Sequence, residues 1–486
     1  MAGETLEKIR ADRIKKLEEL RKRGINPYPS KLIQKNQKIS DIRKKRGDNV
    51  TAAGRIWGWR EHGGSIFADL KDESGKIQIF FQKKNLAKSF ENLKFLDIGD
   101  FILVSGKCFK TAAGELTIDV VEFQLLSKAL RPLPSSWYGL RDIEERYRKR
   151  YLDLLINPEA RGVFETRRDI VKLLRKYLDD HGFLEVTTPA LQPIYGGATA
   201  KPFVTHHNAL NIDLYLRIAD ELYLKRLIVG GFEKVYEIAV DFRNEGIDRW
   251  HNPEFEMLEF YWAYANYQDL MEMTEEMLSE IVKKIKGSFE VEYKGRKVSF
   301  KPPWKRITFR DAIRAETGLD INQITSFEAL NSEAKKKDLS FETKDVRDLA
   351  TGFDALYKTY VRPNILDATF IIDNPYIMRP LAKRKEEDPT KVESIQLVAS
   401  GIELVNAYTE LNDPADQRER WQEEMKRAKK GAAEYQVIDE DYIEALEYGM
   451  PPTAGWGMGI ERLTVILTNQ QTVKDTILFP TLRPSG

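Results

Sequence analysis

Between residues 50 and 126 apolar positions recur at every second residue, in five segments separated by turn-forming residues. This alternation predicts strands at 50–60, 65–71, 76–82, 100–109 and 115–126. A helix-like segment at 85–95 falls between the third and fourth strands. Five strands with a helix at that point indicate an OB-type β-barrel, a fold that often binds single-stranded nucleic acid.

The alternation also predicts which side chains of the barrel point outward. In SIFADLK and KIQIFF the apolar partners face the core, so Phe67, Gln78 and Phe80 face away. An exposed aromatic ring beside an amide can stack on a base and read its edge. Packing against a neighbouring domain explains the same residues equally well, and these observations leave both interpretations open.

Helical periodicity marks segments at 5–23, which ends at Gly24, and at 162–180, which ends at Gly182. The stretch RPLPSSWYGL (131–140) breaks all periodicity and is the best domain boundary. Beyond it, strands and helices mix without a regular βαβ alternation, which favours a mainly antiparallel sheet flanked by helices in an α+β protein. The predicted division is an N-terminal basic extension, a barrel, a linker and a large second domain at 1–49, 50–130, 131–150 and 151–486.

The stretch FRNEGIDRWHNPEFEMLEF (242–260) joins two alternating segments and carries many charges. In the first segment the apolar residues share one face, and Glu237, Asp241, Arg243 and Glu245 share the other. The return strand puts Phe255, Met257, Glu259 and Tyr261 on that second face. A guanidinium group, carboxylates and an aromatic ring on one face suit a nucleotide, although a surface salt-bridge lattice is the alternative.

Composition and charge limit the classes of protein to which the chain can belong. The chain has 486 residues, with 77 basic and 76 acidic side chains, so net charge indicates no partner. Residues 1–50 carry an excess of eight positive charges, which suits phosphate binding or a plain solvated helix. The single cysteine, Cys108, excludes an internal disulfide. Apolar runs stay below the roughly 18 residues that span a bilayer, so we expect a cytoplasmic protein without membrane contact.

A third motif, GWGMGIERL, places three glycines before an apolar helix that carries Arg462. The glycines allow close backbone approach, but their spacing differs from that of the dinucleotide-binding GxGxxG motif. Together, GFLEVTTPAL (182–191), FRNEGIDRWHNPEFEMLEF and GWGMGIERL resemble the three signature motifs of class II aminoacyl-tRNA synthetases. The stretches RIADELYLKRLIVGGFEKVYEI and NAYTELNDP resemble the bacterial-type lysyl-tRNA synthetases of that class.

The resemblance implies ATP-dependent activation of L-lysine to lysyl adenylate, followed by transfer to the 3′ end of tRNA(Lys). It also implies an anticodon-binding role for the barrel and a class II fold for residues 151–486. Arg243 and Arg462 are the expected catalytic residues, because they would hold the α- and γ-phosphates. The full set implied for ATP is Arg243, Glu245, His251, Asn252, Phe255, Glu403, Gly459 and Arg462.

Two further ligand sets follow from the resemblance. Mg²⁺ is expected with ATP, where the family uses two glutamates; one position is Glu403, and the other is Gln396 here. This departure removes a negative charge, which predicts weaker binding at one metal site. The implied lysine contacts are Gly197, Glu221, Arg243, Glu259, Tyr261, Asn406, Tyr408 and Glu410. Three glutamates suit a substrate ammonium group, whereas an aspartate-specific relative needs a cation there.

For tRNA the resemblance implies anticodon contacts from Phe67, Gln78 and Glu115, with backbone contacts from the basic N-terminal helix. It also implies a homodimer with Pro189 near the interface. Three alternatives compete with this interpretation: a relative that attaches lysine-like groups to a protein, a regulatory protein built on a decayed synthetase, and an aspartyl or asparaginyl enzyme. The barrel argues against the first, the retained motif residues against the second, and the pocket acids against the third.

Overall fold

The computed structural model describes residues 2–44, 47–134, 140, 142–340, 346, 348–429 and 438–484. The chain divides into two compact units, Met1–Gly139 and Leu140–Gly486. Each unit is described by itself. The four-part division at 49, 130 and 150 stays a prediction, and residues 135–139 and 141 of the predicted linker lie outside the described residues.

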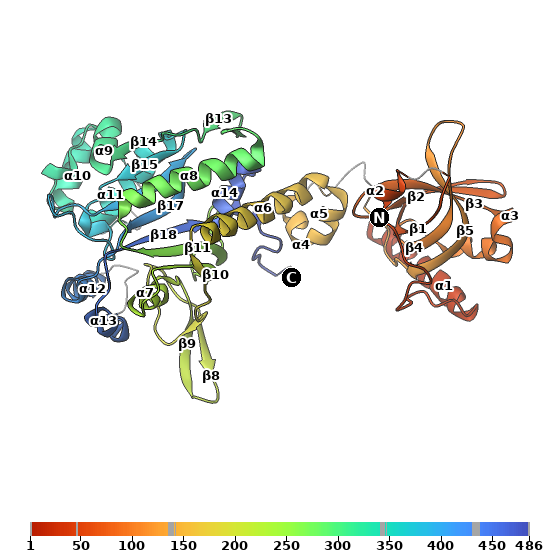
Figure 1. The fold of residues 1–486 in the computed structure, drawn as a ribbon, viewed down its shortest axis with the longest axis horizontal. Helices are drawn as coiled ribbons and strands as arrows, with labels where there is room; N and C mark the ends of the chain where they lie inside the picture. The colour runs from red at the N-terminus through yellow and green to blue at the C-terminus, as the bar shows by residue number, and fades with distance from the viewer. Residues whose placement is uncertain are drawn as a thin grey trace. The chain divides into compact units, whose positions relative to one another are not determined.

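The first unit contains a closed five-stranded barrel with the strand order β1-β2-β3-β5-β4 (Figure 1). The strands are β1 (Asn49–His62), β2 (Ser65–Lys71), β3 (Lys76–Gln82), β4 (Phe101–Lys110) and β5 (Leu116–Ser127). Helical segments α3 (Lys83–Leu86) and η1 (Ala87–Phe95) lie between β3 and β4. The predicted OB-type barrel is therefore confirmed, because alternation along each strand fills the interior with apolar side chains.

Helix α1 (Ala2–Lys22) belongs to the same unit. Some of the basic side chains in this N-terminal region bind other parts of the unit, and others are exposed. Arg13 is buried and donates hydrogen bonds to the carbonyl oxygens of Ile98, Ala129 and Arg131. Lys16 pairs with Asp97 at 2.6 Å. Other basic residues are exposed, namely Lys8, Lys15, Arg21, Lys22 and Arg23. Part of the N-terminal positive charge is therefore structural, and part faces solvent.

The second unit is built on an eight-stranded sheet with the order β14-β15-β16-β17-β18-β11-β10-β6. The pairs β14·β15 and β10·β6 are parallel and the other neighbours are antiparallel, as expected for a mainly antiparallel sheet. The strands are β6 (Leu184–Glu185), β10 (Lys234–Phe242), β11 (Glu254–Ala263), β14 (Lys305–Thr308), β15 (Thr369–Ile372), β16 (Ser394–Ala399), β17 (Ile402–Thr409) and β18 (Thr453–Gly459).

Three helices lie along one face of this sheet: α6 (Pro158–Asp180), α8 (Tyr267–Lys286) and α14 (Ile460–Leu467) (Figure 1). Between them and the sheet lies the main hydrophobic core, where the Phe260 and Trp456 rings stack at 4.9 Å. Asn266 begins α8 with a capping box and Gly287 ends it in the left-handed conformation, so local sequence sets both ends. The opposite face of the central strands carries the polar side chains.

The β10–β11 hairpin has the register that its alternation predicts. Tyr236 pairs with Phe260 and Ile238 with Leu258, whereas Glu237 pairs with Glu259. The apolar pairs therefore share the core face and the charged pair shares the other. The loop between the strands, residues 243–253, begins where β10 ends and returns with Asn252 buried.

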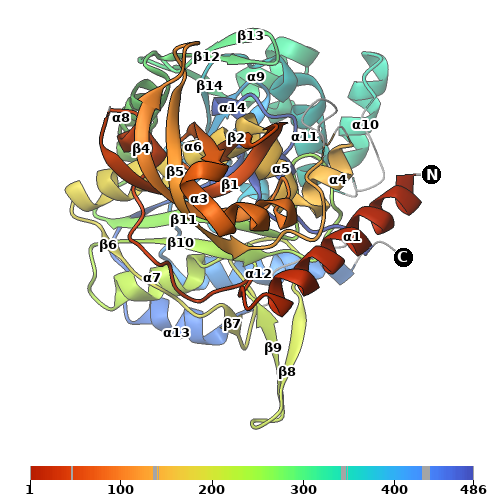
Figure 2. The same cartoon turned by 90° about the vertical axis from the view of Figure 1, so that its right-hand side faces the viewer.

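Smaller elements complete the second unit. A three-stranded sheet combines β7 (Leu191–Gln192), β8 (Val204–His207) and β9 (Ile212–Leu216), and its β8–β9 hairpin projects away from the large sheet (Figures 1 and 2). The further helices include α7 (Glu221–Val229), α9 (Phe309–Thr317), α10 (Phe327–Lys336), α11 (Leu349–Leu356), α12 (Pro414–Lys429) and α13 (Glu440–Glu447). In the part of the chain that the structure describes, every helix is too short or too polar to cross a membrane.

Candidate active site

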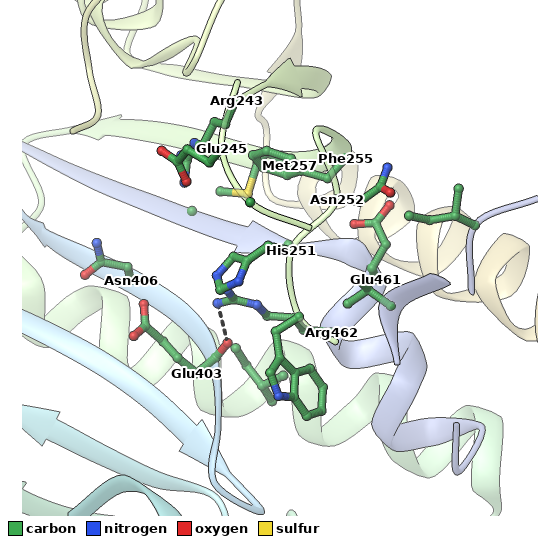
Figure 3. A pocket seen from close by; sticks show the side chains of 17 residues that line it. Arg243, Glu245, His251, Asn252, Phe255, Met257, Glu403, Asn406, Glu461 and Arg462 are labelled. Atoms are coloured by element: carbon green, nitrogen blue, oxygen red, sulfur yellow. Dashed lines mark hydrogen bonds between the residues drawn. The ribbon is translucent and has the colours of Figure 1, made fainter. Parts of the chain in front are cut away.

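A pocket on the polar face of the central strands, called the first pocket, collects the residues expected to bind ATP (Figure 3). They come from the β10–β11 hairpin, from β17, and from the junction of β18 with α14. All eight line this pocket: Arg243, Glu245, His251, Asn252, Phe255, Glu403, Gly459 and Arg462. Strand pairing of β11 with β18, and of β18 with β17, brings these distant segments together.

Two guanidinium groups of the first pocket keep their capacity to bind an anion. Arg243 lies over the Phe255 ring at 5.0 Å and donates from Nε to the Ile218 carbonyl at 3.3 Å. Arg462 donates from Nη1 to the Glu403 carbonyl at 3.0 Å. Among the described residues neither guanidinium forms a salt bridge with a carboxylate, although burial lowers the pKa of Arg462 from its usual value. Half-buried cations without a carboxylate partner suit a polyphosphate.

The loop that carries His251 is ordered by one carboxylate. Asp248 accepts hydrogen bonds from the backbone nitrogens of Trp250 and His251 at 2.6 and 2.8 Å. The same side chain lies 2.8 Å from His251 Nδ1. These contacts lower the pKa of Asp248, the bond to the His251 side chain being the largest favourable contribution. Asp248 therefore fixes the imidazole ring at the pocket edge.

Glu403 and Gln396 lie on the neighbouring strands β17 and β16. Gln396 Nε2 donates to Glu403 Oε2 at 3.1 Å. Gln396 is almost fully buried, and its Oε1 lacks a hydrogen-bond partner among the described residues. A carboxylate and a free amide oxygen side by side fit a hard cation such as Mg²⁺.

A second pocket adjoins the first and collects the residues expected to bind lysine. Its lining includes all eight of them: Gly197, Glu221, Arg243, Glu259, Tyr261, Asn406, Tyr408 and Glu410. Arg243, Met257, Asn406 and Gly457 line both pockets, so the two spaces are contiguous. Two ligands could therefore meet at Arg243.

Two acids of the second pocket are paired with a cation that sequence reasoning missed. Lys225, on α7, is fully buried; its Nζ lies 2.5 Å from Glu221 Oε1 and forms an ion pair with Glu410. Tyr408 also donates to Glu221 at 3.0 Å. Two of the three expected substrate acids therefore already have an internal counter-ion. The only local signal was the four-residue spacing between Glu221 and Lys225, which is common on exposed helices.

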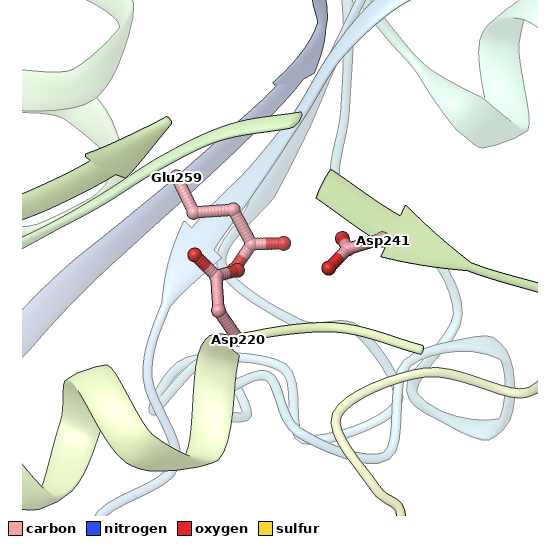
Figure 4. Close-up of side chains that lie close together, drawn as sticks. All are labelled: Asp220, Asp241 and Glu259. Carbon is pink, nitrogen blue, oxygen red and sulfur yellow. The ribbon is translucent and has the colours of Figure 1, made fainter. Parts of the chain in front are cut away.

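The third acid, Glu259, has different neighbours. It accepts a hydrogen bond from the Tyr261 hydroxyl at 3.1 Å and lies beside the buried carboxyl groups of Asp220 and Asp241 (Figure 4). Burial, with added repulsion from Asp241 and Glu221, raises the pKa of Glu259 to about 8. Burial likewise raises the pKa of Asp241 to about 6.

The charged face of the hairpin divides into two parts. Arg243 and Glu245 line the first pocket. Glu237, in contrast, is buried: it accepts from Arg217 Nη1 at 2.7 Å and from the Thr188 hydroxyl at 2.7 Å. Part of the charge on this face therefore stabilises tertiary contacts and does not line either pocket.

Several residues of the first pocket gave no usable signal in the sequence. Trp250, Glu461, Val473 and Ile477 also line it. Val473 donates from its backbone nitrogen to the Arg249 carbonyl at 3.0 Å, which ties the segment after α14 to the hairpin loop. This contact joins residues more than 200 positions apart, so no local pattern could predict it.

The residues expected to read an anticodon lie on the barrel. Phe67 and Phe80 are cross-strand neighbours on β2 and β3, and their rings stack at 4.3 Å. Gln78 accepts a hydrogen bond from the Thr117 hydroxyl at 2.9 Å, and Glu115 is exposed in the turn before β5. Phe67 and Gln78 are half-buried, so part of each side chain remains accessible.

Comparison with known proteins finds a matching family for each of the two units. Residues 142–483 match the family described as tRNA synthetases class II (D, K and N), and residues 50–126 match the OB-fold nucleic acid binding domain. The fold and the two pockets therefore belong to a class II tRNA synthetase.

Curated relatives narrow the family. A lysine–tRNA ligase of Carboxydothermus hydrogenoformans is 47% identical and covers 100% of both chains. Those of Pelotomaculum thermopropionicum and Syntrophomonas wolfei are 46% and 45% identical, covering 99% of this chain and 96% and 98% of the relative. The chain belongs to the lysine–tRNA ligase family.

Gly455 provides a test of the second pocket's packing. A Cβ atom at this position would collide with Glu410 Oε1 and lie 2.6 Å from Tyr261 Cε1. Because the ion pair with Lys225 holds Glu410, we expect Gly455→Ala to destabilise the second unit by about 1–3 kcal/mol. Thermal melting would measure this as a lower Tm. The control Gly162→Ala adds a methyl group to open space on α6 and should not lower the Tm; equal Tm values for both variants would contradict the packing.

Proposed function

We propose that this enzyme activates L-lysine with ATP, forming lysyl adenylate and pyrophosphate, and then transfers the lysyl group to the 3′ end of tRNA(Lys). The observation that carries the proposal is the junction of the two pockets at Arg243. The first pocket has two guanidinium groups without salt-bridge partners among the described residues. The second has three glutamates, of which Glu259 lies close to the buried carboxyl groups of Asp220 and Asp241. An anionic nucleotide and a cationic amino acid suit these two environments.

In this proposal the first pocket holds ATP. Arg243 contacts the α-phosphate and the lysine carboxylate, and Arg462 contacts the γ-phosphate. Phe255 stacks on the adenine ring, opposite Arg462. Glu245, His251, Asn252 and Gly459 line the rest of the nucleotide site, where they can accept from the base and contact the sugar and phosphates. The lining positions of these residues support the proposal.

The chemistry needs no enzyme nucleophile. A carboxylate oxygen of lysine attacks the α-phosphorus, the new P–O bond forms, and the bond to the β-phosphate oxygen breaks as pyrophosphate leaves. A terminal tRNA hydroxyl then attacks the lysyl carbonyl, and AMP leaves. Arg243 holds both reacting groups together and offsets negative charge on the phosphate, so the protein acts by positioning and electrostatics.

Mg²⁺ belongs to this proposal as the partner of ATP. Glu403 and Gln396 would hold it, since a carboxylate oxygen and a free buried amide oxygen lie together there. When bound, the ion neutralises and orients the phosphate oxygens. An amide supplies no negative charge, so the site should bind Mg²⁺ more weakly than a pair of glutamates would.

The variant Gln396→Glu tests the metal assignment. It places two carboxylates about as close as the 3.1 Å contact between Gln396 and Glu403, an arrangement that a divalent cation stabilises. We expect the Mg²⁺ concentration for half-maximal ATP–pyrophosphate exchange to fall about tenfold, by comparison with ligand-charge effects at other hard-cation sites. Gln268→Glu, exposed at the start of α8, is the control. An unchanged Mg²⁺ dependence in Gln396→Glu would refute the assignment.

The second pocket recognises lysine by charge. Lys225 leaves the Glu221 and Glu410 pair with one net negative charge, and Glu259 adds another when ionised. Tyr261, Tyr408, Asn406 and Gly197 complete the lining. An aspartate substrate would bring a carboxylate toward these acids and meet repulsion.

Lysine-dependent ATP–pyrophosphate exchange with a panel of amino acids tests the function. We expect activity with lysine and none with aspartate. In Glu410→Gln the KM for lysine should rise about tenfold to a hundredfold, because a charged hydrogen bond is lost, while the KM for ATP stays within about twofold. Glu440→Gln, exposed and paired with Arg418, is the control. Exchange with aspartate alone would overturn the proposed function, and an unchanged lysine KM in Glu410→Gln would overturn this pocket assignment.

We further propose that the barrel reads the anticodon through Phe67, Gln78 and Glu115, with exposed basic residues of α1 contacting the tRNA backbone. The two-unit organisation and the OB-fold match support this proposal. The enzyme is proposed to act as a homodimer in the cytoplasm, where tRNA is charged. Its dimer interface would involve the segment around Pro189.

Phe67→Ala tests the barrel surface. Loss of one base–aromatic stack should raise the KM for tRNA about tenfold, within the usual range for such contacts, while exchange without tRNA stays unchanged. Phe67→Tyr keeps the ring and its stack on Phe80 and should retain the original KM. Phe101→Ala, on β4, removes a partly exposed aromatic ring elsewhere on the barrel and is a second control. A tRNA KM that Phe67→Ala does not change would contradict the proposal.

A further inference from the structure

Three carboxyl groups meet behind the wall of the second pocket (Figure 4). Asp220 lies just before α7, Asp241 near the end of β10, and Glu259 within β11. Each offers one oxygen, and these oxygens all lie within 4.8 Å of one another. Glu259 lines the second pocket, whereas Asp220 and Asp241 lie behind it. The group is called the acid cluster below.

The acid cluster lacks the contacts that buried carboxylates usually have. Asp220 is 0% exposed, and neither of its oxygens has a hydrogen-bond donor among the described residues. Its carboxyl group points toward Glu259 and Asp241 (Figure 4). Asp241 is also 0% exposed; Arg217 Nε lies 3.4 Å from it, and the charges of Arg243 and Arg217 partly offset the effect of its burial. Burying an ionised carboxylate without compensation costs several kcal/mol or more, so the cluster must take up either protons or a cationic partner.

Arg217 alone cannot neutralise the acid cluster. Its Nη1 is engaged by Glu237 at 2.7 Å, so one guanidinium serves two carboxylates. Lys225 is likewise shared between Glu221 and Glu410. In the part of the chain described here, no salt bridge reaches Asp220 or Glu259. Lys225 is therefore committed to other acids, and Arg217 is shared between Glu237 and the cluster member Asp241.

Charge balance indicates what is missing. Around the second pocket six buried carboxyl groups face four cationic side chains, Arg217, Lys225, Arg243 and Arg379; the carboxyl groups belong to Asp220, Glu221, Glu237, Asp241, Glu259 and Glu410. A bound lysine, with two ammonium groups and one carboxylate, adds one net positive charge. With all six carboxyl groups ionised, one negative charge then remains. This part of the argument rests on the proposed lysine site.

We propose that Asp220, Asp241 and Glu259 bind a hard divalent cation, separate from any ion that ATP carries at Glu403. Three carboxylates in an all-oxygen site suit Mg²⁺, Mn²⁺ or Ca²⁺ rather than a softer metal. A divalent cation also offsets the negative charge that remains. Bound there, it would fix the Glu259 carboxylate, which also accepts from the Tyr261 hydroxyl, in its place at the lysine pocket.

Protons are the competing partner. Burial raises the pKa values of Asp220, Asp241 and Glu259. Low pH therefore favours a protonated cluster without a bound metal ion. The charged or titratable groups around these acids are Arg217, Glu221, Lys225, Glu237, Arg243, Tyr261, Tyr408 and Glu410. Ion binding should therefore strengthen as the pH rises, because a metal ion needs the deprotonated carboxylates.

Mn²⁺ titration of the full-length protein, followed by electron paramagnetic resonance without ATP or lysine, tests the proposal. At pH 8.5 we expect one bound Mn²⁺ per chain that persists in Glu403→Gln, which lacks the carboxylate of the ATP-side site. Asp220→Asn and Asp241→Asn should each weaken this binding at least tenfold. Asp213→Asn, exposed on β9, should leave it unchanged.

Each other outcome overturns the proposal. Absence of Mn²⁺ binding by the wild-type protein would show that protons alone satisfy the cluster. Binding lost in Glu403→Gln would assign the ion to the ATP side, and binding retained in both Asn variants would place it elsewhere. Because the titration contains no substrate, its result is independent of the lysine assignment, which the exchange assay tests separately.

Discussion

Side-chain alternation in the β10–β11 hairpin is the constraint on which the active site depends. The register places Tyr236 against Phe260 on the core face, where Phe260 stacks on Trp456 of β18. The same register necessarily turns Glu259 to the opposite face. A slip of one residue would bury the charged face in the apolar core and expose the aromatic one. Hydrophobic packing behind the sheet therefore holds the charged residues in front of it.

Charge neutralisation is the second constraint. The second pocket needs acids to recognise an ammonium group, yet unpaired buried acids are costly. The structure meets both demands by sharing cations: Lys225 serves Glu221 and Glu410, and Arg217 serves Glu237 and Asp241. One cation cannot neutralise two ionised carboxylates, so each group of three side chains keeps a net negative charge. That remainder attracts a cationic substrate, and at the acid cluster it exceeds what a single lysine provides.

In the first pocket, in contrast, the arginine side chains are not paired with carboxylates among the described residues. Arg243 and Arg462 are held by backbone carbonyls, which fix their positions without neutralising them. Their charge remains available for phosphate. Because Arg243 lines both spaces, one guanidinium can join the chemistry of the nucleotide to that of the amino acid. Both pockets contain arginine and glutamate side chains, and they differ mainly in which of these charges are paired.

The sequence by itself determined what depends on near neighbours: the five barrel strands, the hairpin faces around Glu259, and the motif residues that resemblance assigned to ligands. Strand alternation and turn residues act over a few positions, so they can be read from the chain directly. Only the tertiary structure decided which charges are paired. The ion pair of Lys225 with Glu410, the contact of Val473 with Arg249, and the approach of Asp220 to Asp241 and Glu259 each require the folded sheet, because they join elements that the chain keeps apart.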